Sequence, residues 1–149
     1  MSEKRIVTVS GSGHGAGKTA LVERLARGFA GCGAVKVRPE EDLPPEVAEE
    51  ADSAQNPRKD TGRMLAAGAA RVWLVQGPVG HCVGAVRGIL DEPGYDTLLV
   101  ETNALVEELD PDLAFYVRGP GEPKPGAAEV RDRADVIVSS ETLIEPREE

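Results

Sequence analysis

The fold of this chain is decided by one stretch, Val7-Thr8-Val9-Ser10-Gly11-Ser12-Gly13-His14-Gly15-Ala16-Gly17-Lys18-Thr19. Its apolar start predicts a β-strand, and its glycines predict a tight turn that ends in Gly-Lys-Thr. The residues that follow have helical spacing on one face, with Leu21, Val22, Leu25, Ala26 and Phe29. A strand, a glycine-rich turn, Gly-Lys-Thr and a helix together indicate a P-loop, which binds the phosphates of a nucleotide.

The chemistry of such a loop assigns a role to most of its residues. Backbone N–H groups surround the phosphates at the start of the helix, and we expect them to come from Gly13, His14, Gly15, Ala16, Gly17, Lys18, Thr19 and Ala20. Lys18 is expected to reach the β- and γ-phosphates, and the Thr19 hydroxyl to bind Mg²⁺. The first glycine of the usual motif is replaced here by Ser12.

Composition limits the class of protein. The 149 residues are expected to form a single domain, and with 40% hydrophobic and only 3% aromatic residues the core must consist of Val, Leu, Ile and Ala. A net charge of −9 argues against nucleic-acid or anionic-membrane binding. Cys32 and Cys82 lack metal-ligand or CxxC spacing, which argues against zinc and a disulfide. Without a signal-peptide pattern or an apolar run of about 18 residues, we expect a cytoplasmic protein.

Strand and helix patterns alternate along the chain. We expect strands over residues 5–9, 34–38, 71–76, 95–101, 112–117 and 135–138. Helices are expected over residues 18–29, from 60 or 61 onward, around 82–90, over 105–109 and over 127–133. This alternation favours an α/β three-layer sandwich with a mostly parallel sheet, the P-loop NTP hydrolase fold, with its ligand at the carboxyl ends of the strands.

Residues 39–60 differ from the rest of the chain, because they contain four prolines, eight carboxylates and few large apolar side chains. This composition predicts that the segment is a mobile, solvated loop with a helical turn at 46–51. An alternative interpretation is a lid or switch beside the γ-phosphate, since the loop would leave the strand next to the P-loop strand. The acidic tail at 145–149 is expected to fray.

Two carboxylates are candidates for catalysis and for Mg²⁺. The apolar strand Leu98-Leu99-Val100 ends on Glu101, and a buried carboxylate is costly unless a cation or a hydrogen-bond donor meets it. Glu101 is therefore a candidate for the metal or the attacking water. Asp60 is the other candidate, because it ends the acidic, proline-rich segment that could act as a switch. Either Asp60 or Thr61 is also expected to cap the helix that follows.

Other polar residues allow weaker hypotheses. Lys59 and Arg38 are possible phosphate or substrate contacts, although surface charges are the commoner case. His81 follows a strand and is either a cleft residue or a simple loop histidine, and a base role for His14 is an open alternative to a solvated one. The chain has no Asn-Lys-x-Asp element for reading guanine, and Ser139-Ser140-Glu141 is a weak candidate for contacting a base.

The order of motifs resembles the molybdopterin-guanine dinucleotide biosynthesis protein B (MobB) family of small P-loop proteins. Nearly the whole chain takes part, and the matching pieces run from Val9 to Leu25, then Lys59-Asp60-Thr61, Leu65-Ala66-Ala67-Gly68-Ala69, Leu99-Val100-Glu101-Thr102-Asn103, Pro111-Asp112-Leu113 and Arg133-Ala134-Asp135-Val136-Ile137. The chain departs from the family where Val37-Arg38-Pro39 replaces an Ile-Lys-His segment, and where Thr102 replaces a glycine.

This resemblance implies a Mg²⁺-dependent nucleotide-binding protein that uses GTP, or ATP, and hydrolyses it weakly. It implies a homodimer with an accessory role in molybdenum cofactor biosynthesis, beside a molybdopterin-nucleotidyl transferase. Lys18, Glu101 and Asp60 would then be the catalytic residues, and Thr19, Glu101 and Asp60 the metal ligands. Two alternatives stay open, a small-molecule kinase that uses ATP and a nucleotide-dependent adaptor without catalysis.

Overall fold

The computed structural model describes residues 4–11, 17–50, 60–119 and 131–140. The elements in these ranges are β1 (Arg5–Gly11), α1 (Lys18–Gly28), β2 (Gly33–Pro39), β3 (Glu46–Glu50), α2 (Asp60–Ala66), β4 (Arg71–Gly77), α3 (Val79–Leu90), β5 (Thr97–Glu101), α4 (Val106–Leu109), β6 (Leu113–Arg118) and β7 (Val136–Ser139). The segments 51–59 and 145–149, and most of the helix expected over 127–133, lie outside the described residues.

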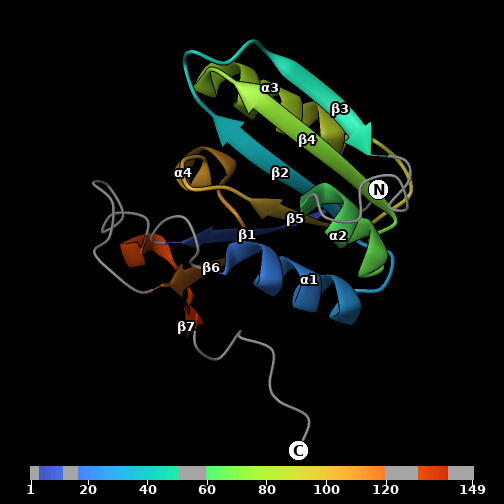
Figure 1. Cartoon of the computed structure of the whole chain (residues 1–149), viewed down its shortest axis with the longest axis vertical. Helices are drawn as coiled ribbons and strands as arrows, with labels where there is room; N and C mark the ends of the chain where they lie inside the picture. The colour runs from blue at the N-terminus through green and yellow to red at the C-terminus, as the bar shows by residue number, and fades with distance from the viewer. Residues whose placement is uncertain (1–3, 12–16, 51–59, 120–130, 141–149) are drawn as a thin grey trace, which may run out of the picture.

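The strands form one seven-stranded sheet in the order β3-β4-β2-β5-β1-β6-β7 (Figure 1). All neighbouring strands are parallel except β3, which runs antiparallel to β4. A mostly parallel sheet places the carboxyl ends of its strands along one side, and the internal strand β1 reaches that side between β5 and β6. The α/β class with a mostly parallel sheet, predicted from the alternation of patterns, is confirmed.

Helices cover both faces of the sheet (Figure 1). Because side chains alternate along a strand, each strand contributes to two cores. One core contains Val7, Val9 and Leu99 together with residues of α1 and α2. The other contains Leu98 and Val100 together with residues of α3 and α4. This helix–sheet–helix arrangement is compatible with the expected three-layer sandwich.

The helical turn predicted at 46–51 is wrong, because Glu46–Glu50 forms the edge strand β3. The acidic composition hid this strand, since its charges are stabilised by a partner that is distant in sequence. The guanidinium of Arg71 donates two hydrogen bonds to the Glu49 carboxylate, at 2.7 and 2.8 Å, and a third to Glu92. Charged residues are common on edge strands, where they also discourage pairing with other chains.

The predicted neighbourhood of the acidic segment is also wrong. The segment leaves β2, and the whole of β5 lies between β2 and β1, the strand that leads into the glycine-rich stretch. A lid directly beside β1 therefore has no support from the strand order. The position of β2 instead brings it against the carboxylate at the end of β5.

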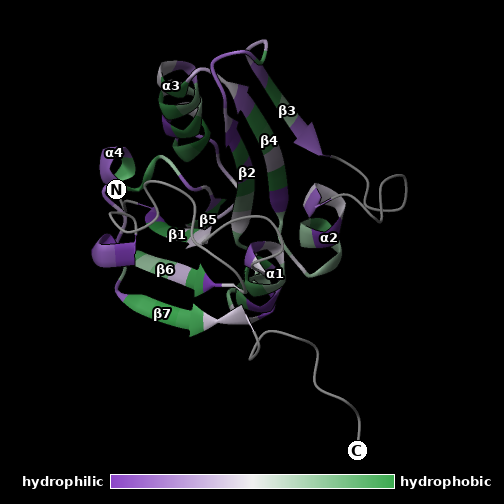
Figure 2. Ribbon diagram, turned by 60° about the vertical axis from the view of Figure 1, so that its left-hand side comes forward, coloured by the Kyte–Doolittle hydropathy of each residue, from purple (hydrophilic) through white to green (hydrophobic). Residues whose placement is uncertain are grey.

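The two outermost strands of the sheet are β3 and β7, and Figure 2 shows β7 to be hydrophobic over much of its length. Val136 is 38% exposed and Ile137 is 48% exposed, although both are apolar. Within the described ranges, the helices are too short or too polar to cross a membrane.

Candidate functional site

The first turn of α1 carries the described part of the predicted P-loop. Gly17 precedes the helix with a φ of 98°, a left-handed conformation in which a side chain would be strained, so a glycine is required there. Lys18, Thr19 and Ala20 form the first turn, and no side chain caps it. Gly13, His14, Gly15 and Ala16 lie outside the described residues.

Glu101 ends β5 at the carboxyl edge of the sheet, where only 4% of the residue is exposed. The Thr19 hydroxyl donates a hydrogen bond to this carboxylate, with Oγ1 lying 3.0 Å from Oε1 and 3.2 Å from Oε2. The two residues come from the helix that follows β1 and from the strand beside β1. The structure therefore places Glu101 beside the threonine of the Gly-Lys-Thr motif. Its role at a metal or an attacking water stays a prediction.

Lys36 is a residue of this cluster that the sequence did not reveal. It pairs in register with Glu101 across β2 and β5, and its Nζ lies 4.0 Å from Glu101 Oε2. Residues in register point to the same face, and Ala34 and Leu99, two positions earlier, lie in the core under α1 and α2. One signal was available, because a lysine inside a central parallel strand interrupts a position that is normally apolar.

Asp60 completes the cluster from the start of α2, where its carboxylate forms an ion pair with Lys36. The prediction that Asp60 or Thr61 caps this helix is wrong. Both lie inside the first turn, and the Thr61 hydroxyl donates to Glu50 Oε1 at 3.0 Å. The side chains at the start of α2 are thus bonded to β2 and β3 instead of to their own backbone.

An ion pair between α1 and α2 holds Asp60 in place. Arg63 donates from Nε and Nη2 to the two oxygens of Glu23, at 2.9 and 2.8 Å. Arg63 Nη1 also lies 3.8 Å from Oδ1 of Asp60, which is one helical turn earlier on α2. The helices α1 and α2, which carry Thr19 and Asp60, are therefore linked by a bidentate contact.

Burial and charge act in opposite directions on Glu101. Desolvation raises the pKa of its carboxyl group, and the Asp60 charge raises it further. The Lys36 and Lys18 charges and the hydrogen bond from Thr19 lower this pKa, but they do not fully offset burial. Such opposing effects on one carboxyl group are frequent at functional sites.

The segment after Glu101 is attached to the end of β1. The Gly11 N–H donates to Asn103 Oδ1 at 2.9 Å, and the Thr102 N–H donates to the Val9 carbonyl at 3.0 Å. These two bonds fix where the chain enters the glycine-rich stretch relative to Glu101. Asn103 was part of a motif in the sequence, but its pattern gave no indication of this contact.

The other polar candidates do not join the cluster. His81 lies on α3, and its Nε2 is 3.3 Å from the Glu46 carbonyl, on the β3 side of the molecule. Arg38 is exposed two positions beyond Lys36, and Ser139 ends the edge strand β7. Lys59 and Glu141 lie outside the described residues.

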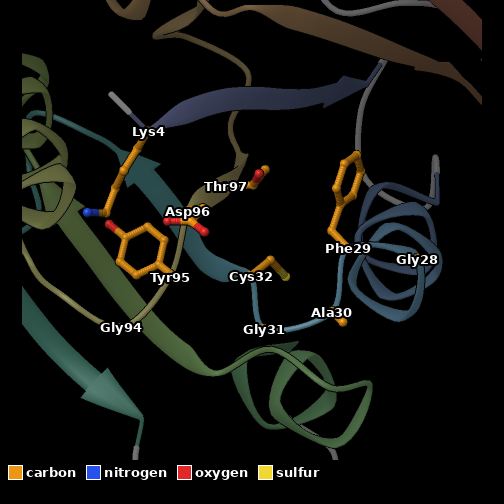
Figure 3. Close-up of a pocket in the computed structure, with 10 residues that line it drawn as sticks. All are labelled: Lys4, Gly28, Phe29, Ala30, Gly31, Cys32, Gly94, Tyr95, Asp96 and Thr97. Carbon is orange, nitrogen blue, oxygen red and sulfur yellow. The ribbon is translucent and has the colours of Figure 1, made fainter. Parts of the chain in front are cut away.

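A cavity of about 740 Å³ lies at the amino ends of β1, β2 and β5, away from the carboxyl ends that carry the cluster (Figure 3). Its lining includes Lys4 before β1, Cys32 before β2 and Thr97 at the start of β5. Thr97 and Glu101 are the two ends of β5, roughly 13 Å apart along the strand. The cavity therefore provides no binding space beside Lys18 and Thr19, and it does not support an acceptor site for phosphoryl transfer there.

No protein-family model, curated protein or solved structure shows a significant match to this chain. The fold and the site together define an α/β protein with a mostly parallel sheet. At the carboxyl edge of that sheet, Thr19, Lys36, Asp60 and Glu101 converge from α1, β2, α2 and β5.

Proposed function

We propose that this chain binds a nucleoside triphosphate together with Mg²⁺ at the carboxyl edge of its sheet and hydrolyses it slowly. One observation carries the proposal. The threonine of the Gly-Lys-Thr motif hydrogen-bonds both oxygens of Glu101, an acidic residue at the end of the strand beside β1. P-loop NTPases join these two elements at the phosphates and the metal.

Phosphate binding is supported by the start of α1. The eleven-residue helix begins after Gly17 with no side-chain cap and no acidic residue in its first turn, so the positive end of its dipole favours an anion there. Lys18 adds a positive charge at the same place. From the sequence, we expect the glycine-rich stretch from Gly13 to Gly17 to supply the remaining backbone donors.

The donor set fits Mg²⁺, which prefers oxygen ligands and usually binds through one or two carboxylates, a hydroxyl, waters and substrate phosphates. Thr19, Glu101 and Asp60 present only oxygen atoms. These three residues would hold the ion, which would supply charge stabilisation on the phosphates when bound. The role of the chain itself is to position Lys18 and the Thr19 hydroxyl and to keep Glu101 away from bulk water.

Slow turnover is the expected consequence of this arrangement. Both candidate catalytic carboxylates already have protein partners, Lys36 for Asp60 and Thr19 for Glu101. A carboxylate that is held by a protein donor is less available to orient an attacking water. Positioning and charge compensation by Lys18 would then supply most of the acceleration.

The biological role follows from the motif order, which resembles the MobB family. We propose GTP as the preferred nucleotide, with ATP as the alternative, and an accessory function in molybdenum cofactor assembly. The same resemblance supports a homodimer that meets a molybdopterin-nucleotidyl transferase. A thermal-shift series with GTP, ATP and a molybdopterin ligand in the presence of Mg²⁺ discriminates these ligands, because a bound ligand stabilises the folded state by mass action.

The site assignment is tested by calorimetric titration of the whole chain with MgGTP and MgATP. Lys18→Ala is expected to weaken binding by about tenfold or more, since a charge-assisted phosphate contact is lost. Lys4→Ala is the matched control, because Lys4 precedes β1 and lies at the amino ends of the strands, away from the proposed site. Equal affinity in the parent chain and in Lys18→Ala would overturn the assignment.

A further inference from the structure

The side chain of Lys36 lies between two carboxylates that belong to different elements. It forms an ion pair with Asp60 of α2, and its Nζ is 4.0 Å from Glu101 Oε2 on β5. About 28% of the Lys36 side chain is exposed, so its stem is largely covered while the ammonium group reaches the carboxyl edge. A positive charge at this point offsets one of the two negative charges on the carboxylates that the proposed function assigns to Mg²⁺.

We propose that Lys36 is a resident counter-cation of the Asp60–Glu101 pair, which keeps a divalent metal from binding there until a nucleotide is present. This inference rests on the proposed function, because it concerns how the same site acquires its metal. Lys36 thereby couples metal binding to nucleotide binding. It is a positioning residue, and the phosphates of the nucleotide are what compensate its charge when the metal arrives.

The number of protein ligands explains why the metal alone would not displace the ammonium group. Among the residues that the structure describes, no three side chains of Asp, Glu, His or Cys form a group that could hold a metal. Mg²⁺ needs close to six oxygen ligands and gives up its waters reluctantly. Two carboxylates and the Thr19 hydroxyl are therefore too few to compete with a preformed ion pair, whereas added phosphate oxygens would change the balance.

Replacing Lys36 by a neutral residue removes the ammonium group that competes with the metal for the two carboxylates. Arg63 would stay 3.8 Å from Asp60 and Lys18 would still act on Glu101, but the ammonium group that lies between the two carboxylates would be gone. Two neighbouring carboxylates disfavour being charged together. A divalent ion relieves that repulsion, so the site would bind metal on its own. A lysine that only attaches β2 to α2 makes a different prediction, namely lower stability with no gain in metal affinity.

The test uses the whole chain with Mn²⁺ alone, followed by electron paramagnetic resonance. Lys36→Met keeps the length of the side chain and removes its charge. We expect it to bind Mn²⁺ at least about tenfold more tightly than the parent chain, since an interfering cation is lost. Two control variants are expected to retain the parent affinity for Mn²⁺. Lys36→Arg keeps the charge, and Lys4→Met removes a lysine at the amino ends of the strands.

A double variant locates the gained metal. Lys36→Met combined with Asp60→Asn should lose the gain in Mn²⁺ affinity, because one of the two carboxylates has been neutralised. A gain that survives in the double variant would overturn the inference. An unchanged or weaker Mn²⁺ affinity in folded Lys36→Met would overturn it as well.

Lys36→Gln provides a second neutral variant, in which an amide can still donate to Asp60 and preserve the fold. The same Mn²⁺ gain is expected for it, and its absence in the folded protein contradicts the proposal. The metal-only titration contains no nucleotide, so its failure is separate from failure of the proposed function. Absence of GTP and ATP binding by the parent chain would refute the nucleotide site, whatever the Mn²⁺ result.

Discussion

Lys36 and Glu101 occupy matched positions on the neighbouring parallel strands β2 and β5, with 4.0 Å between Lys36 Nζ and Glu101 Oε2. Only 4% of Glu101 is exposed, and the Thr19 hydroxyl and the Lys36 charge are its partners from α1 and β2. This relationship brings a buried carboxylate and a lysine together at the end of β5, which makes that place the best candidate for chemistry in the described chain.

Glu101→Gln is expected to stabilise the chain at neutral pH in the absence of ligand. Desolvation raises the pKa of this carboxyl group above its ordinary value of 4.5. The folded state therefore holds the proton more tightly, and wild-type stability falls as pH rises from 4.5 through the raised pKa. Glutamine avoids the buried charge, can still accept from Thr19, and leaves Lys36 paired with Asp60.

Thermal unfolding between pH 4 and pH 8 measures the effect. A gain of about 1 kcal/mol, or roughly 2–4 °C, is expected at pH 7 and should shrink toward zero below pH 4.5. Glu40→Gln, an exposed carboxylate after β2, is the matched control and should leave the profile unchanged. A Glu101→Gln variant less stable than wild type at pH 7 would contradict the prediction.

Asn103→Ala is expected to loosen the point where β1 enters the glycine-rich stretch. The change removes the acceptor of the buried Gly11 N–H, and an unsatisfied buried donor costs about 1–3 kcal/mol. Hydrogen exchange at Gly11 should accelerate by about tenfold or more. Asn103→Asp keeps an acceptor oxygen and should retain most of the protection; equal exchange in the two variants would rule out this role for Asn103.

Gly77→Ala is expected to destabilise the junction between β4 and α3. Gly77 has a φ of +128°, and an added Cβ would lie 2.9 Å from the Pro45 Cα, which is backbone and cannot move easily. We expect a loss of about 2–3 kcal/mol in urea unfolding. Gly84→Ala in α3, where nothing lies within 4 Å, should instead stabilise by up to about 1 kcal/mol. Similar effects of the two substitutions would disprove the assignment of strain.

The bidentate contact between Arg63 and Glu23 is expected to couple α2 to α1 only modestly. The Arg63 side chain is 38% exposed and the Glu23 side chain 18%, so solvent screens much of the attraction. A double-mutant cycle with Arg63→Ala and Glu23→Ala should give about 0.5–1 kcal/mol at low salt and less in 1 M NaCl. Coupling that does not respond to salt would indicate packing of the side-chain stems instead of an ion pair.

The local elements could be predicted from the sequence because their causes are local. The helix expected over 18–29 is α1 (Lys18–Gly28), and the strand expected over 71–76 is β4 (Arg71–Gly77). Apolar spacing, glycine and proline mark these elements within a few residues in the sequence, even where, as for β4, distant strands also pair with them. The position of Glu101 at the end of an apolar strand likewise made it a candidate before its partners were known.

The edge strand β3 could not be predicted in this way. Its residues are mostly acidic and exposed, and the strand exists because β4 offers a ladder of hydrogen bonds and Arg71 offers a matching charge. Composition described the segment as a solvated loop, since a strand held by distant partners leaves little apolar pattern of its own.

Sequence alone thus determined the α/β class and singled out the Gly-Lys-Thr motif and the two candidate carboxylates. Only the tertiary structure decided the strand order, which separates β2 from β1 by β5 and sets Lys36 against Glu101 and Asp60. The physical reason is that periodicity and turn chemistry act between near neighbours in the chain. The register of parallel strands instead depends on burial and hydrogen bonding across the whole sheet, and that register selects the cation that meets the buried carboxylate.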